Sequence, residues 1–301
     1  MADIDPDIYS IKSRDSLEKI VNKVDIEHFK CDYWVSPATV LNIFDDLSRA
    51  TDDINLNDLL VFLHNIKVYP KKRVQQSIFN KSPQTLSKKL DKVFDAFWLI
   101  VDPESHKYDN NVRYNEPPFQ LYGVDLFMAV DSTFFPIQKP KDRELEIQYY
   151  SLKHKEHGVK LEVCVSLTSG RICWVSPEIY RGICHDLTIS NASGLVKIPL
   201  RENERILGDG AYISQQYEHI FLTPVRNNAN LPAVQLILNS LKSSQGSIVK
   251  NLFSRVTTGG CLELVEYWRG DDLGEYVKYI YIIFYILDKF ILAKEPLRDW
   301  N

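Results

Sequence analysis

The chain has 301 residues, of which 45% are hydrophobic and 25% are charged, and both fractions are ordinary for a globular protein. This length allows one large domain or a main domain with a small appendage. The formal net charge of −4 excludes a uniformly basic nucleic-acid-binding protein, so any contact with nucleic acid must come from a local patch.

The cysteines and the apolar runs indicate the compartment. The five cysteines are scattered and form no CxxC pair, which argues against a zinc site and against a disulfide framework. We therefore expect reduced thiols in a nuclear or cytoplasmic, intracellular protein. The most apolar run, Tyr279 to Leu287, is too short to span a bilayer, so we predict a buried helix there and no membrane partner.

Residues 1–105 are predicted to form an all-α region. Ser36-Pro37 is a helix start signal, and residues 55–66 carry an apolar stripe at helical spacing. A short helix and a tight turn come next, and Ser82-Pro83 begins a longer helix. These are the parts of a helix-turn-helix, which we place at about residues 55–98.

Basic side chains gather in this helix-turn-helix region. They are Lys71, Lys72, Arg73, Lys81, Lys88, Lys89 and Lys92. We predict that the last three lie on the exposed side of the longer helix, where they can meet DNA phosphates. The alternative is an ordinary helical hairpin with a solvated basic face.

The rest of the chain alternates strands with helices. We predict a polar linker at residues 101–122, a charged loop at 138–150, a strand at 217–222, and helices at 231–256 and 275–293. This order of elements predicts an α/β fold, in which a sheet of mixed strand direction is flanked by helices.

A single carboxylate lies inside the apolar run Phe127 to Pro136. A run of this length, rich in aromatic and β-branched residues, predicts a strand that is buried on both faces. Asp131 is costly in such a strand unless a metal ion or a neighbouring Arg or Lys pairs with it. The run alone does not decide between a structural acid and a functional one, because carboxylates in ion-pair networks are perturbed as well.

A second strand also ends on an acid. The short apolar strand before Gly208 leads directly into Asp209. Two strands that deliver carboxylates to their ends can share a hard divalent cation such as Mg²⁺, which prefers oxygen ligands. We therefore expect Asp131 and Asp209 to lie side by side.

Several short motifs follow one another along the second half of the chain. They are Asp-Ser-Thr-Phe-Phe-Pro-Ile at 131–137, Gly-Ile-Cys-His-Asp-Leu at 182–187, Leu-Gly-Asp-Gly-Ala-Tyr at 207–212 and Leu-Thr-Pro at 222–224. Their order and spacing resemble the DDE-type transposases of the Harbinger/PIF group over roughly residues 55–293. Ser132 and Ala211 stand where that family usually has glycine. The resemblance implies an RNase H-like domain over residues 115–295 that uses Mg²⁺ or Mn²⁺.

The resemblance also implies three catalytic acids that hold two metal ions. Asp131 and Asp209 fall on the first two positions, and Lys250 falls on the third. An ammonium group cannot ligate a cation and repels it, so Lys250 would leave the site incomplete, or would pair with an aspartate in place of the metal. Glu263 or Glu266 would supply the third ligand if the alignment is shifted.

The His-Asp pair at 185–186 allows two interpretations. Asp186 is a further candidate metal ligand. Alternatively, Asp186 caps the helix that follows and His185 forms a hydrogen bond into the core, a structural role for both.

Two functions fit these motifs. The first is a transposase-derived endonuclease that cleaves DNA phosphodiesters or transfers strands with a divalent metal. The second is a catalytically inactive, domesticated transposase that acts as a DNA-binding or protein-interaction module. The chain carries no P-loop, GxSxG or HExxH pattern, which argues against an unrelated α/β enzyme. The resemblance also implies an accessory DNA-binding protein and leaves oligomer formation open.

Overall fold

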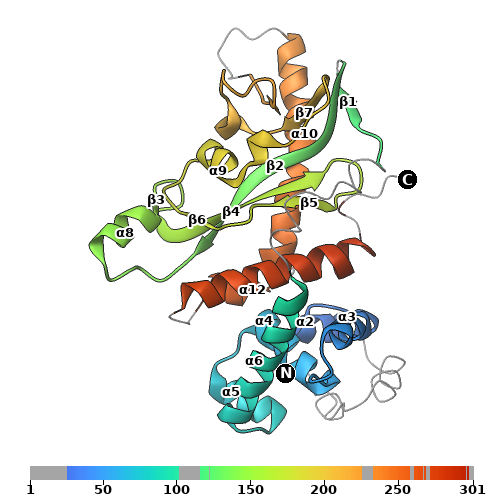
Figure 1. The fold of residues 1–301 in the computed structure, drawn as a ribbon, viewed down its shortest axis with the longest axis vertical. Helices are drawn as coiled ribbons and strands as arrows, with labels where there is room; N and C mark the ends of the chain where they lie inside the picture. Colours follow the sequence, from blue (N-terminus) through green and yellow to red (C-terminus); the bar gives the residue numbers. More distant parts are fainter. Residues whose placement is uncertain are drawn as a thin grey trace. The chain divides into compact units, whose positions relative to one another are not determined.

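The computed structural model describes most of the chain (Figure 1). The described residues are 26–101, 116–121, 123–225, 233–257, 261–266, 268, 272–295 and 297. The chain divides into two compact units, Met1–Asp102 with Val256–Ile291 and Pro103–Arg255 with Leu292–Asn301. The last helices thus cluster with the N-terminal ones, whereas the sequence assigned them to the sheet domain of residues 115–295. The predicted boundary at residues 105–115 lies outside the described residues.

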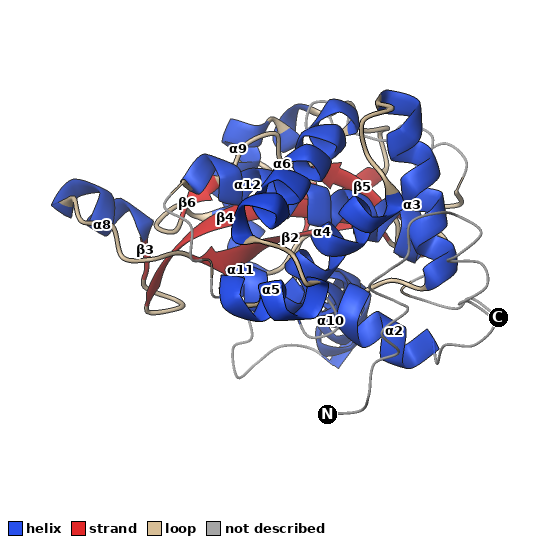
Figure 2. Cartoon of the chain, turned by 90° about the horizontal axis from the view of Figure 1, so that it is seen from below, coloured by secondary structure: helices blue, strands red, loops and turns tan. Residues whose placement is uncertain are grey.

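The second unit is built on a mixed sheet whose central strand is β2, Val124–Pro136. Strand β4, Glu156–Ser166, pairs antiparallel with β2, and the two run side by side (Figure 2). On its other side β2 pairs parallel with β7, Glu204–Leu207, which pairs parallel with β8, Phe221–Leu222. The outer strands are β1 Phe119–Leu121 on β2, and β3 Tyr150–Ser151, β5 Ile172–Val175 and β6 Tyr180–Arg181 on β4. The predicted mixed sheet is confirmed.

Helices cover both faces of this sheet. Val130 and Ile206 belong to a core cluster on one face, and Leu195 of the 3₁₀ helix η3, Leu195–Lys197, packs into it. Helix α9, Asp186–Ser193, precedes η3 on this face and hydrogen-bonds to β4. Side chains alternate along a strand, so Leu207 points to the opposite face. A Cβ atom built on Gly246 of α10, Ala233–Val256, would lie 4.0 Å from Leu207 Cδ2, which puts α10 on that opposite face.

The first unit is all helical. Its helices are α2 Ile26–Tyr33, α3 Pro37–Ala50, α4 Leu56–Val68, α5 Lys72–Phe79, α6 Pro83–Ile100, α11 Leu262–Glu266 and α12 Leu273–Ile286, which continues as the π-helix η6 Leu287–Leu292. The start signals that the sequence predicted are confirmed: Ser36 accepts a hydrogen bond from the Thr39 amide, and Ser82 accepts one from the Thr85 amide. Each serine satisfies an amide at the start of its helix that has no partner within the helix.

Aromatic rings hold the helices of the first unit together. The ring of Phe62 on α4 lies 5.3 Å from that of Phe97 on α6 and 5.8 Å from that of Tyr279 on α12, measured between centroids. The helix predicted over Tyr279–Leu287 is therefore a buried core helix. Among the residues that the structure describes, no helix is long and apolar enough to cross a membrane.

The expected linker at 101–122 contains strand β1, Phe119–Leu121, and two other predicted elements of the second unit are wrong. The expected loop at 138–150 contains α8, Arg143–Tyr149, because Asp142 caps it by accepting hydrogen bonds from the amides of Glu144 and Leu145. The expected strand at 217–222 is reduced to β8, since the residues before Phe221 form turns. Both errors arose where a short polar capping or turn signal was given less weight than the local composition.

The predicted exposure of the three basic residues on α6 holds for one of them. Lys88 is exposed. Lys89 pairs with Asp58, a buried acid on α4, and donates to Asn57 Oδ1 at 3.2 Å. Lys92 Nζ lies 3.2 Å from Asp53 Oδ1 and 3.8 Å from Asp58 Oδ2. Lys89 and Lys92 therefore join α6 to α4 and compensate the charge of a carboxylate that would be costly to bury alone.

Replacing Lys89 should therefore affect stability more than replacing Lys88. We expect Lys89→Ala to lower the free energy of unfolding by about 2–3 kcal/mol, because it leaves the buried Asp58 carboxylate with the Asn55 amide and the more distant ammonium of Lys92. Lys88→Ala should change it by less than about 0.5 kcal/mol. Urea denaturation followed by circular dichroism measures both. Equal effects of the two substitutions would contradict a structural role for Lys89.

Candidate metal centre

The two predicted aspartates lie level with each other on neighbouring parallel strands, with Asp131 inside β2, which continues to Pro136, and Asp209 just beyond the end of β7. Ala129 of β2 is paired with Leu207 of β7, and each aspartate lies two residues beyond its member of this pair. The charge of Asp209 acts on Asp131: burial raises the pKa of Asp131 to about 6, and the charge of Asp209 adds to this rise. The structure thus brings Asp131 and Asp209 close enough for their charges to interact, as expected.

Asp131 points to the sheet face that α10 covers. Val130 and its register partner Cys164 belong to the core cluster on the α9 face, so the next residue along β2 points the other way. The Ser132 amide donates to Asp131 Oδ1 at 2.8 Å, and this bond and the positive charge of Lys153 oppose the rise in the pKa of Asp131. Burial and repulsion outweigh both, so the ionised Asp131 lies where a cation would be favoured.

Asp209 is exposed and held by its own backbone turn. It is the N-cap of the 3₁₀ helix η4, Gly210–Tyr212, and its Oδ1 accepts a hydrogen bond from the Ala211 amide at 2.8 Å. This bond orients the carboxylate immediately after the strand. The local sequence explains the geometry, because an aspartate with its side chain bonded to an amide two residues on forms a tight turn.

Asp186 is bound by protein groups on the α9 face. It is the first residue of α9, and its Oδ1 accepts hydrogen bonds from Ser132 Oγ and, at 3.3 Å, from Lys160 Nζ. Lys160 also donates to the Cys184 carbonyl at 2.7 Å. The expected hydrogen bond of His185 into the core is wrong, because this side chain is exposed at the N-cap position and makes no cap bond.

A buried glutamate that the sequence analysis did not single out lies beside this group. Glu162 of β4 is opposite Ser132 in the register and accepts hydrogen bonds from Ser190 Oγ, from Ser193 Oγ at 2.9 Å and from the Tyr212 hydroxyl at 3.5 Å. Burial raises the pKa of Glu162 to about 7, although these hydrogen bonds oppose the rise. Lys160 and Glu162 alternate with apolar residues along β4, and this pattern was the signal that could have revealed them.

In the described part of the chain, the helix that covers the face of Asp131 brings no third acid to the two aspartates. Helix α10 contains no Asp or Glu, and Lys250 on it is exposed. Within the described residues Lys250 forms no ion pair with either aspartate. Glu263 and Glu266 are exposed on α11, which belongs to the other compact unit. A search of the described residues finds no group of three or more His, Cys, Asp or Glu that could hold a metal ion.

The residues present fit one cation better than two. Mg²⁺ is commonly bound by one or two carboxylates and completes its shell with water and substrate phosphate. Asp131 and Asp209 supply such a pair, and their mutual repulsion favours a cation between them. Asp186 already accepts from Ser132 and Lys160, so it contributes to the negative charge near Asp131 and is less available as a ligand.

Comparison with known proteins gives one match. A family model described as DDE superfamily endonuclease matches residues 130–280, half of the chain, and the matched region includes Asp131, Asp186 and Asp209. No curated protein and no solved structure matches the chain.

The raised pKa of Asp131 predicts how stability depends on pH. Between pH 4 and 6 the folded state binds more protons than the unfolded state, so this group lowers the free energy of unfolding as the pH rises through that window. Asp131→Asn removes the effect. In metal-free buffer at pH 7.5 we expect the variant to be more stable than the wild type by on the order of 2 kcal/mol, and nearly equal to it at pH 4.

Chemical denaturation at the two pH values measures this difference. The matched control is Asp52→Asn, which removes an exposed carboxylate in the other compact unit and should change the stability little at either pH. A loss of stability in Asp131→Asn at pH 7.5 would contradict the account, because it would mean that the charged carboxylate stabilises the fold.

Proposed function

The chain belongs to the family of DDE superfamily endonucleases, and from this premise we propose that it is a transposase-derived protein of RNase H-like fold that binds one Mg²⁺ or Mn²⁺ ion on Asp131 and Asp209 and acts on DNA phosphodiesters. The observation that supports this most strongly is the parallel pairing of β2 with β7, which sets Asp131, within β2, level with Asp209, just beyond the end of β7. Burial raises the pKa of Asp131 and the charge of Asp209 adds to this rise, which supports the same site.

The bound cation would polarise a phosphate oxygen and stabilise the charge that develops on it. Two backbone amides orient the carboxylates that would hold this cation. The Ser132 amide orients Asp131, and the Ala211 amide orients Asp209. Below about pH 6 a proton on Asp131 would compete with the cation, so cation binding should weaken in acid.

The Harbinger/PIF group is the subtype that we propose within this family. The support is the order of the motifs at residues 131–137, 182–187, 207–212 and 222–224. Ser132 departs from the glycine that is usual at its position, and its hydroxyl has a structural partner in Asp186. This departure is compatible with the fold, because the side chain bonds to α9.

A second candidate function is a DNA-binding or protein-interaction module without cleavage activity. One observation favours it: the helix that covers the face of Asp131 has no acidic residue, and Lys250 occupies the position where the resemblance implies the third acid. With two carboxylates the centre can hold a cation, but it lacks the ligand for a second one. Metal binding without DNA cleavage is the outcome that this candidate predicts.

For DNA contact we propose the helix pair α5–α6 as a helix-turn-helix. Asn80 joins the helices in the left-handed conformation, with φ 47°, and Phe79 of α5 and Leu86 of α6 pack on Val61 of α4. The exposed basic residues on and around this pair are Lys71, Lys72, Arg73, Lys81 and Lys88. Lys89 and Lys92 belong to the proposed surface as well, but their ion pairs with Asp58 of α4 make them weaker candidates for phosphate contact. The accessory DNA-binding protein stays a prediction.

Metal titration tests the proposed centre. In calorimetry at pH 7.5 we expect the full chain to bind one Mn²⁺, and Asp131→Asn and Asp209→Asn each to weaken binding by about tenfold or more, because each removes one of the two ligands. The matched control is Glu218→Gln, which removes an exposed carboxylate of the same unit.

Nicking of supercoiled plasmid in the presence of Mn²⁺ then separates the two candidate functions. Cleavage that Asp131→Asn abolishes supports the endonuclease, whereas Mn²⁺ binding without cleavage supports the inactive module. If the wild type and Asp131→Asn bind Mn²⁺ equally, Asp131 is not a metal ligand, and the proposed metal centre is wrong for both candidate functions.

The salt dependence of DNA binding tests the helix pair. Because Lys88 is exposed and makes no ion pair within the described residues, Lys88→Ala should weaken binding to duplex DNA and lower the slope of log affinity against log salt concentration by about 1. Fluorescence anisotropy at three salt concentrations measures both. Lys197→Ala, an exposed lysine of the other unit, is the control. An unchanged slope in Lys88→Ala would contradict the proposed surface.

A further inference from the structure

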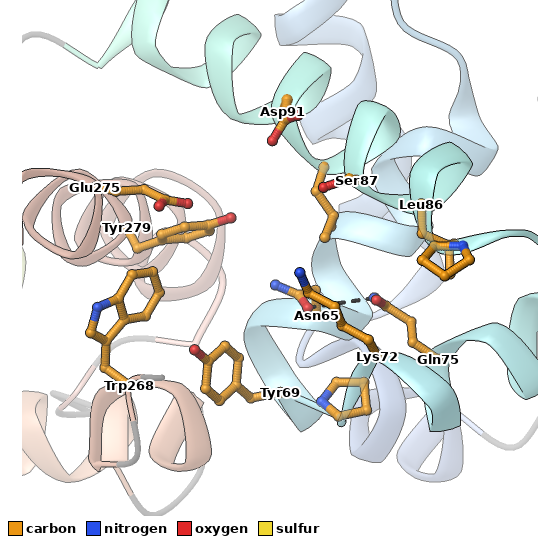
Figure 3. Close-up of a pocket in the computed structure, with 13 residues that line it drawn as sticks. Asn65, Tyr69, Lys72, Gln75, Leu86, Ser87, Asp91, Trp268, Glu275 and Tyr279 are labelled. Carbon is orange, nitrogen blue, oxygen red and sulfur yellow. Dashed lines mark hydrogen bonds between the residues drawn. The ribbon is translucent and has the colours of Figure 1, made fainter. Parts of the chain in front are cut away.

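A cavity of about 300 Å³ lies within the helical unit, apart from the metal centre (Figure 3). Asn65 of α4 and residues of α5 and α6 form one side of it, and Tyr69, Trp268 and residues of α12 form the other (Figure 3). All of its lining residues belong to one compact unit. Its volume is at the lower end of small-ligand sites and suits a single long side chain.

Aromatic rings form one wall of this cavity. The ring of Trp268 lies 6.0 Å from that of Tyr69 at an interplanar angle of 13°, and 5.6 Å from that of Tyr279 at 53°. The tilt of Tyr279 makes the wall a corner rather than a flat surface. Tyr69 ends α4 in the left-handed conformation, with φ 43°, which is unfavourable for a residue with a Cβ atom.

Two carboxylates share the cavity with the rings. Figure 3 shows Glu275 beside Tyr279, and Asp91 on the neighbouring helix α6. Neither side chain makes an ion pair or a hydrogen bond within the described residues. Burial raises the pKa of both carboxyl groups, and the charges of Asp272 and Asp91 raise that of Glu275 further. A positive charge entering the cavity would relieve this repulsion.

Rings and carboxylates together select a cation. The faces of Trp and Tyr attract a positive group electrostatically, and a guanidinium can stack on a ring while it donates hydrogen bonds to a carboxylate. Leu86 and Leu90 also line the cavity and offer apolar surface for the methylenes of a long side chain. A phosphate group would be repelled by Asp91 and Glu275, so the cavity does not suit the DNA backbone.

We propose that this cavity binds an arginine side chain from a basic segment of a partner protein. Arginine fits better than lysine, because its planar guanidinium stacks on aromatic rings, is weakly hydrated and pairs with carboxylates through a fixed fork of donors. The proposal is independent of the metal centre, which lies in the other compact unit.

Lys72 tunes the affinity of the cavity. This residue lines the same space, and its charge lowers the pKa of both Asp91 and Glu275. No ion pair within 4.0 Å joins it to either acid in the described part of the chain. Lys72 therefore partly offsets the negative potential without occupying the position of a bound guanidinium. Removing its charge should strengthen the binding of a cationic ligand, and neutralising either acid should weaken it.

The experiment uses the full chain and three capped pentapeptides, Gly-Ser-Xaa-Ser-Gly, in which Xaa is arginine, lysine or citrulline. Citrulline keeps the shape of arginine and lacks its charge. Binding is followed by the NMR signal of the Trp268 indole N–H, which Trp268→Phe identifies. We expect arginine to bind more tightly than lysine, and citrulline to bind at least about fivefold more weakly than arginine.

Variants then test the named groups. Glu275→Gln and Asp91→Asn should each weaken arginine binding by about fivefold, and Lys72→Met should strengthen it by about threefold. Asp52→Asn, which removes an exposed acid of the same unit, should leave binding unchanged. Equal binding of citrulline and arginine, or weaker binding by Lys72→Met, would overturn the proposal. So would a duplex DNA oligonucleotide that shifts the Trp268 signal more than the arginine peptide does.

Discussion

The parallel pairing of β2 with β7 is the constraint on which the proposed centre depends. The register pairs Ala129 of β2 with Leu207 of β7, so Asp131 inside β2 and Asp209 just beyond the end of β7 bring two like charges together. The arrangement is unfavourable for the protein alone, because burial and the charge of Asp209 both raise the pKa of Asp131. A protein retains such an arrangement when something outside the chain compensates it, and a hard cation is the compensating group that two carboxylates select.

The two faces of the sheet provide different groups near Asp131 and Asp209. On the α9 face, Ser132 and Lys160 both donate to Asp186, and Glu162 is bound by side chains from α9 and η4. These charges and hydroxyls are satisfied within the protein and fix α9 to the sheet. On the α10 face, the helix supplies no acid to complete a second metal position. Hydrogen bonds on the α9 face therefore hold the strands of the centre in place, whereas the α10 face lacks an acidic ligand for a second metal ion.

Much of the fold could be predicted from local patterns, and the exceptions have physical causes. The apolar run around Asp131, the caps at Ser36 and Ser82, and the buried helix near Tyr279 carry their signals within a few residues. Glu162 and Lys160 were missed because their partners come from other elements, with Ser190 lying 28 residues away. The ion pairs of Lys89 were missed for the same reason, since Asp58 lies 31 residues away.

The aromatic cavity could not be predicted from sequence either, because the residues that form it are even further apart along the chain. Tyr69 and Trp268 lie about two hundred residues apart, and they meet because residues 256–291 pack with the N-terminal helices. A periodic pattern shows that a helix has a buried face, but it does not show which other helix covers that face. Sequence patterns therefore predicted the candidate acids from the apolar strands that carry or precede them, while the residues that surround them required the tertiary structure.

The central claim is that the charges of Asp131 and Asp209 interact where β2 pairs with β7. The most direct measurement is the pKa of the Asp131 side chain, followed by carbon-13 NMR of its carboxyl group in metal-free buffer, in the wild type and in Asp209→Asn. The account predicts a value near 6 in the wild type and a lower value in the variant, because a repelling charge has been removed. An identical pKa in both proteins would contradict it, since the two carboxylates would then be too far apart to share a cation.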